Sequence, residues 1–150
     1  MSERCRVVRE PIDTAALLAG CTSPEDGAAL LFVGIVRNHN DGRSVGHLSY
    51  DSYAEMAERV LEEIVEEAES RWSVGGIAVV HRIGRLEIGE TSVAIAVAAP
   101  HRGEAYEASR YIIEELKKRA PIWKREGYVD GDSEWLGGQL PGVAEGAHER

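Results

Sequence analysis

Apolar positions along the chain follow two periods, which together predict a series of strands and helices. Runs that are continuously apolar, or apolar at every second residue, are typical of strands. Six segments have this pattern: 4–9, 28–36, 47–53, 77–81, 92–99 and 122–129. Gly34 interrupts the second run and predicts a bulge or a close approach of another backbone. The run ends in Arg37, and the polar segment that follows, 38–44, is interpreted as a flexible loop.

Three other segments have apolar residues at helical spacing and predict helices at 14–18, 54–72 and 103–120. Asp13 is a suitable N-cap for the first helix, and Gly20 lies just past its end. In the longest helix the apolar residues step by four along one stripe, while glutamates occupy the other faces. Pro121 ends the third helix.

The predicted elements follow the order β-α-β-β-α-β-β-α-β, with both hairpins and crossovers. This order indicates an α+β fold with one mixed sheet and helices on one face. A chain of 150 residues fits a single domain, which we expect to span 1–136. The segment 137–150 is rich in glycine and nearly lacks large apolar residues, so it predicts a flexible C-terminal tail.

Composition and charge narrow the class of protein. No apolar run is long enough to span a membrane, and the N-terminus lacks the apolar core of a signal peptide, so we expect a cytoplasmic protein. The net charge of −9 argues against non-specific binding to nucleic acid. Cys5 and Cys21 have no metal-like spacing, and no two histidines form an HxH or HxxxH pair. We therefore expect free thiols, no metal and no cofactor.

Basic residues gather near the end of the third predicted helix. From Leu116 to Arg125 there are five basic residues and no acidic one, although the chain as a whole is acidic. A local excess of cations indicates an anionic ligand. Cations also suit a helix C-terminus, which would by itself explain residues 117–119. It does not explain His101 and Arg102, which precede the helix, where its dipole disfavours cations.

Six cations are therefore candidate ligands of an anion: Arg37, His101, Arg102, Lys117, Lys124 and Arg125. Lys117 lies on the flank of the buried stripe, where a lysine can lose its proton and act as a base or nucleophile. An ordinary surface lysine is the alternative, and Arg37 can equally be a solvated loop arginine. His101 and Arg102 adjoin the free N–H groups of a helix start, which suit an anion. These patterns predict a phosphate- or carboxylate-binding pocket and name no reaction.

Four motifs carry a resemblance to a known family. They are FVGIVRNHN (32–40), HRIGRLEIGE (81–90), AAPHRGEAYEA (98–108) and LKKRAPIWKRE (116–126). In this order and spacing they resemble the large, catalytic subunit of molybdopterin synthase, over nearly the whole predicted domain. The segment after Trp135 matches no motif of that family.

The resemblance implies an α/β hammerhead fold with an additional antiparallel β subdomain. It implies a sulfurtransferase of molybdenum cofactor biosynthesis, which converts cyclic pyranopterin monophosphate to molybdopterin. The sulfur would come from the C-terminal Gly-Gly thiocarboxylate of a small ubiquitin-like partner subunit. Two large subunits would form a homodimer with one small subunit at each end, giving a heterotetramer.

The resemblance also implies a role for each candidate residue. Lys117 and Lys124 match the catalytic lysines, with Lys117 near the partner's terminal glycine and Lys124 near the pterin. The residues that match the substrate site are Phe32, Arg37, His101, Arg102 and Arg125. Two alternatives stay open: a non-catalytic module that binds an anion or a partner's carboxylate, and a hydrolase that uses Lys117.

Overall fold

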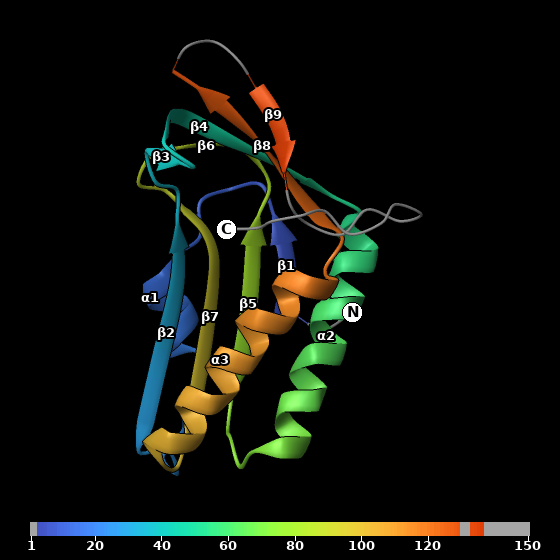
Figure 1. Ribbon diagram of the computed structural model, residues 1–150. Coiled ribbons are helices and arrows are strands. Elements are labelled where there is room, and N and C mark those ends of the chain that lie inside the picture. The colour runs from blue at the N-terminus through green and yellow to red at the C-terminus, as the bar shows by residue number, and fades with distance from the viewer. Residues whose placement is uncertain (1–2, 130–132, 137–150) are drawn as a thin grey trace.

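The structure is a computed structural model and describes residues 3–129 and 133–136, so the predicted tail at 137–150 lies outside it. Four strands form the sheet that carries the larger core (Figure 1). In order across the sheet they are β1 (Cys5–Val8), β5 (Ile77–Arg82), β7 (Thr91–Ala99) and β2 (Ala28–Ile35). β1 runs parallel to β5, and the other pairs are antiparallel. All four strands were predicted from the apolar pattern, within one or two residues at each end.

Helices cover both faces of this sheet. α2 (Ala54–Arg71) and α3 (Arg102–Arg119) pack side by side on one face, and the short α1 (Thr14–Ala19) lies on the other (Figure 1). Along β7, Val93, Ile95 and Val97 join the core under α2 and α3. Ala96 and Ala98 pack instead with the leucines of α1. The predicted placement of helices on one face is therefore wrong, and burial on both faces explains why β7 is apolar at every position from Val93 to Ala99.

Five strands form a second sheet beyond one end of the first (Figure 1). β4 (Arg43–Ser52) pairs with β3 (His39–Asn40), β6 (Gly84–Glu87) and β8 (Ile122–Tyr128), and β8 also pairs with β9 (Ser133–Leu136). The single mixed sheet predicted from periodicity is therefore wrong. Every pairing in this second sheet is antiparallel, which gives the antiparallel subdomain that the family resemblance implies.

Residues 39–44 form a tight hairpin, in place of the flexible loop expected from the polarity of 38–44. β3 pairs with the start of β4 through a two-residue turn at Asp41 and Gly42. Both turn residues have positive φ, 52° and 79°, as in a type I′ turn. An Asp-Gly pair is a strong signal for this turn, and it fixes the register of the hairpin.

Local signals at the helix ends behave as expected. The Asp13 side chain accepts a hydrogen bond from Ala16 N at 3.1 Å, and Gly20 caps the other end of α1. α3 ends before Pro121, as predicted. Among the described residues, no helix is both long and apolar enough to cross a membrane.

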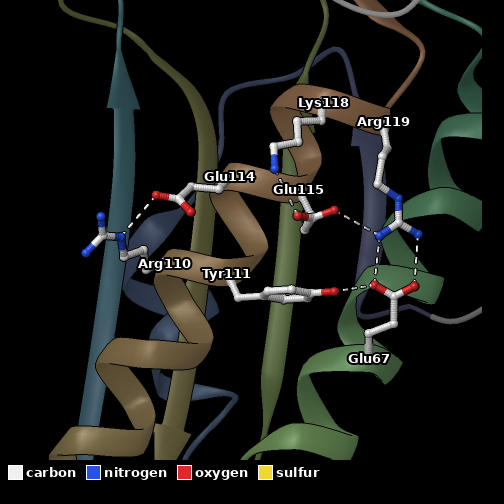
Figure 2. Close-up of polar contacts among 7 residues, drawn as sticks. All are labelled: Glu67, Arg110, Tyr111, Glu114, Glu115, Lys118 and Arg119. Atoms are coloured by element: carbon white, nitrogen blue, oxygen red, sulfur yellow. Dashed lines mark hydrogen bonds and ion pairs between the residues drawn. The ribbon is translucent and has the colours of Figure 1, made fainter.

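An ion-pair cluster fastens the end of α3 to α2 (Figure 2). The Arg119 guanidinium donates to both oxygens of Glu67, at 2.7 and 3.0 Å, and also to Glu115 at 3.2 Å. The Tyr111 hydroxyl donates to Glu67 at 2.6 Å. The bonds from Arg119 and then Tyr111 lower the pKa of Glu67 to about 2. The cluster holds the last turn of α3, which carries Lys117.

Candidate active site

A pocket of about 270 Å³ opens where the two sheets meet the C-terminal end of α3. Its walls come from both sheets and from α3, which are brought together only by the fold. The lining residues are Phe32, Gly34, Ile35, Arg37, His39, Leu48, Tyr50, Ser92, Val93, Lys117, Lys124 and Glu126. Four predicted site residues, Phe32, Arg37, Lys117 and Lys124, are among them.

β2 shapes one wall of the pocket through a close approach to β7. The register between the two strands shifts at Gly34 and Ile35, which is the predicted bulge. A Cβ at Gly34 would lie 2.7 Å from Val93 Cγ1 and 3.3 Å from Ser92 Oγ, so neighbouring side chains, and not another backbone, leave no room for a side chain at this position. Arg37 lies two residues beyond this bulge and lines the pocket.

The two lysines reach the pocket from elements joined by the turn at Pro121. Lys117 lies in the last turn of α3, and Lys124 lies in β8 opposite Tyr50 of β4. Lys117 is exposed and Lys124 is half-buried. Two ammonium groups and the Arg37 guanidinium in one pocket produce a positive site in an acidic protein, which attracts a small anion.

Behind the lysines lies a buried histidine. His81 is only 5% exposed, and its ring contacts Tyr50 edge-on at 5.0 Å between centroids. His81 Nδ1 lies 2.9 Å from the carbonyl oxygen of Arg82. A carbonyl only accepts, so Nδ1 carries the proton and Nε2 is the free acceptor. Burial, with a smaller effect from the charge of Lys117, lowers the pKa of His81 to about 4. His81 is therefore neutral at physiological pH.

A buried carboxylate, Glu126, also lines the pocket and lies two residues from Lys124 on β8. Glu126 is 2% exposed and accepts hydrogen bonds from Asn40 Nδ2 at 3.2 Å and from the Tyr128 hydroxyl at 2.8 Å. Asn40 Oδ1 in turn accepts from Arg37 Nη2 at 3.4 Å. Arg37 is thus linked to Glu126 through one amide.

Three predicted site residues lie away from this pocket. His101 caps the start of α3 and Arg102 is its first residue, whereas Lys117 lies near its end. At 1.5 Å per residue, the fifteen positions between Arg102 and Lys117 span roughly 22 Å. Arg125 neighbours Lys124 on β8, and because side chains alternate along a strand it faces the other side of the sheet. Of the predicted cations, one chain therefore groups only Arg37, Lys117 and Lys124.

The other basic residues at the end of α3 have structural roles. Lys118 pairs with Glu115 at 3.4 Å, and Arg119 forms the cluster with Glu67 described above. They fit the alternative reading of cations placed at a helix C-terminus.

Sequence reasoning missed Asn40, Tyr50 and Glu126. Residues i and i+2 of a strand share a face, so a pocket lysine at 124 in a strand from 122 to 129 predicts that Glu126 also faces the pocket. The Asp-Gly turn would have located Asn40 in a hairpin. No local signal identifies Tyr50, because its place depends on the pairing of β4 with β8.

A larger cavity of about 560 Å³ lies beside α1, between this helix and strands β1 and β5. Glu3, Glu10 and Asp13 line it together with Arg4 and Arg6, so the charges are mixed. Arg4 is already paired with Glu62 and Glu69. The smaller pocket is the better candidate for an anionic ligand, because it holds the predicted lysines.

The fold and this pocket define an α+β protein with a pocket at the junction of two sheets and a helix, lined by the three cations Arg37, Lys117 and Lys124. The model of the MoaE protein family matches residues 7–119. A molybdopterin synthase catalytic subunit from Halalkalibacterium halodurans is 42% identical over 139 residues, 93% of this chain and 88% of that protein. The chain belongs to the MoaE protein family.

Solved structures agree with this assignment. The crystal structure of molybdopterin synthase from Staphylococcus aureus has a TM-score of 0.86 and 39% identity, and covers 91% of this chain and 99% of that one. A protein–protein complex of subunits 1 and 2 of molybdopterin-converting factor from Helicobacter pylori has a TM-score of 0.71 and 26% identity. That match covers 93% of this chain and 96% of that one.

Proposed function

We propose that this chain is the catalytic subunit of a molybdopterin synthase, which converts cyclic pyranopterin monophosphate to molybdopterin by adding two sulfurs as a dithiolene. The observation that carries the proposal is the convergence of Phe32, Arg37, Lys117 and Lys124 on one pocket. These residues lie up to 92 positions apart in sequence, and they are the residues that match the family's site. Relatives that bear the name molybdopterin synthase catalytic subunit support the same function.

The pocket suits the two parts of this substrate. Arg37 and the two lysines supply fixed positive charge for the cyclic phosphate, in a site that partly excludes water. Phe32 supplies an apolar wall for the pterin ring. Placing fixed cations before the substrate arrives lowers the cost of organising the site during the reaction.

The sulfur would arrive on the C-terminal thiocarboxylate of a small ubiquitin-like subunit. The related complex from Helicobacter pylori contains two subunits of molybdopterin-converting factor, which supports such a partner. In the proposal, Lys117 lies beside the partner's terminal acyl group and Lys124 beside the pterin. Sulfur forms a bond to the pterin carbon, and water then cleaves its bond to the acyl carbon, which leaves the partner's terminal carboxylate. Each lysine can exchange a proton with the group it faces during these steps.

Neither cysteine suits a sulfur carrier or nucleophile. Cys5 is fully buried, and burial raises its pKa to about 12. Burial also raises the pKa of Cys21. A thiol must ionise to react. This supports a partner as the source of sulfur, and a cytoplasmic heterotetramer built on a homodimer remains part of the proposal.

The decisive experiment is reconstitution. Purified protein is incubated with cyclic pyranopterin monophosphate and a thiocarboxylated small subunit, and molybdopterin is measured as its oxidised fluorescent derivative. Molybdopterin is expected only when all three components are present. Formation of a stable complex without product would instead identify a non-catalytic module that binds a partner's carboxylate. Product without the small subunit would refute the sulfur route.

A further inference from the structure

Arg37 donates a hydrogen bond to a buried amide, Asn40, whose orientation is fixed by its two neighbours. Glu126 carries a carboxylate, which only accepts hydrogen bonds, so the Asn40 group 3.2 Å away must be the NH₂. Arg37 carries a guanidinium, which only donates, so the Asn40 group 3.4 Å away must be the oxygen. The two neighbours require the same orientation of Asn40, and each of the two bonds has one charged partner.

The hydrogen bonds from Arg37 through Asn40 to Glu126 end in residues that the fold holds in place. Asn40 is 4% exposed and lies in the two-residue strand β3, which is set by the Asp-Gly turn. Glu126 lies on β8 and is also bonded by the Tyr128 hydroxyl. The Tyr128 ring is covered by the Arg43 guanidinium, 3.6 Å from the ring centroid. Arg37 itself is exposed, so this series of hydrogen bonds connects buried residues to a cation at the pocket.

We propose that Asn40 is a positioning residue, which anchors the Arg37 guanidinium through the buried carboxylate of Glu126 and leaves its charge available to the anionic ligand. This inference rests on the proposed function for the identity of the ligand. Within the described part of the chain, Arg37 forms no ion pair with a carboxylate. A direct pair with Glu126 would hold the guanidinium equally well but would offset its charge. The neutral amide of Asn40 between them orients the Arg37 guanidinium without pairing it directly with a negative charge.

A matched pair of asparagines provides the first test. Asn40→Ala removes the link, whereas Asn38→Ala removes an exposed amide of the same loop whose oxygen lies 3.0 Å from His39 Nδ1. Asn40→Ala is expected to raise the KM for the cyclic phosphate substrate about five- to tenfold, with kcat changed less than twofold, because the bond that orients Arg37 is lost. Asn38→Ala should change KM less than about twofold. Equal KM values for the two variants would overturn the proposal.

A double-mutant cycle tests whether Asn40 acts through Arg37. If it does, Asn40→Ala should have almost no further effect on KM in an Arg37→Ala background. A full five- to tenfold effect in that background would show that Asn40 acts by another route, and would overturn the proposal. The same cycle is run on the affinity for inorganic phosphate, measured by calorimetry. That titration tests Asn40 even if no molybdopterin is formed, so failure of the proposed function is distinguishable from failure of this inference.

Exchanging the amide of Asn40 and the carboxylate of Glu126 distinguishes loss of folding from loss of Arg37 positioning. The double variant Asn40→Asp/Glu126→Gln restores the hydrogen bonds, since the new amide donates to the new carboxylate and the carboxylate accepts from Arg37. It also pairs Arg37 directly with a negative charge. We expect a melting temperature close to wild type and about tenfold weaker phosphate binding. Phosphate affinity equal to wild type in this folded variant would overturn the proposal.

Discussion

Lys117 and Arg102 lie at opposite ends of α3, so one chain does not present both to the same small ligand. The helix is 18 residues long and is fastened to α2 near Lys117 by the Arg119–Glu67 pair (Figure 2). Bending it to close a gap of roughly 22 Å would break its backbone hydrogen bonds. If Arg102 binds substrate, it must reach the pocket of a neighbouring chain, as a homodimer would allow.

Mixing of inactive variants tests this arrangement. Arg102→Ala and Lys117→Ala homodimers should each be strongly impaired. When the two are mixed and allowed to exchange subunits, about half of the dimers are mixed and each has one intact pocket, which should restore about a quarter of wild-type activity. Lys117→Ala mixed with Lys124→Ala is the control and should restore nothing, because both lysines line the pocket of one chain. No recovery in the first mixture would remove Arg102 from a shared site.

Replacement of Lys117 should abolish turnover without unfolding the protein. Lys117 is exposed, so Lys117→Ala should change the free energy of unfolding by less than about 0.5 kcal/mol. Loss of a proton-transfer group should slow single-turnover formation of product by at least about 100-fold. Lys117→Arg should fail as well, since a guanidinium keeps its charge but does not release its proton. Lys118→Ala, next in the chain and paired with Glu115, is the control and should stay close to wild type.

Near wild-type rates for Lys117→Arg would show that Lys117 contributes only charge. The acid–base role proposed for it would then be wrong, although its place in the pocket would stand.

His81 should make the protein less stable as pH falls from about 6.5 to 4. Burial holds its pKa at about 4, below the value near 6.5 of an unfolded chain. Above pH 6.5 both states are neutral and His81 adds no pH dependence. Between 6.5 and 4 the unfolded state binds a proton that the native state does not, so the free energy of unfolding falls, by about 3 kcal/mol in total.

Urea unfolding at pH 7.0 and pH 4.5 measures this effect. His81→Gln should lose most of the decrease in stability over that interval, whereas His39→Gln, which changes an exposed ring, should retain it. An identical decrease in wild type and His81→Gln would show that other groups cause the acid sensitivity.

Removal of both thiols should leave activity nearly unchanged. Alanine is the better replacement at Cys5, because this side chain is fully buried and a serine hydroxyl would need a new partner there. Cys5→Ala/Cys21→Ala is expected to cost about 1–2 kcal/mol of stability from lost packing and less than twofold in kcat. A folded double variant that makes no molybdopterin would contradict sulfur delivery by a partner.

The sequence by itself determined most helices and strands of this fold and the positive charge of its candidate site. Within residues 3–129 and 133–136, apolar period and turn chemistry located all three helices and six of the nine strands, because helix stripes, caps and proline act within a few residues. The cations at 117 and 124 and the glycine at 34 were visible as departures from local pattern. The three missed strands, β3, β6 and β9, are each four residues or shorter, so period alone has too few positions to identify them.

Tertiary structure decided which strands pair and therefore which residues meet. β4 and β8 are about 70 residues apart, and their pairing places Tyr50 opposite Lys124 and brings Glu126 toward Asn40. Period along a strand reports which face is buried, but it holds no information on the partner strand. The same limit hid the separation of Arg102 from Lys117. Sequence listed both as cations, and only the straight 18-residue helix between them placed one in the pocket and the other far from it.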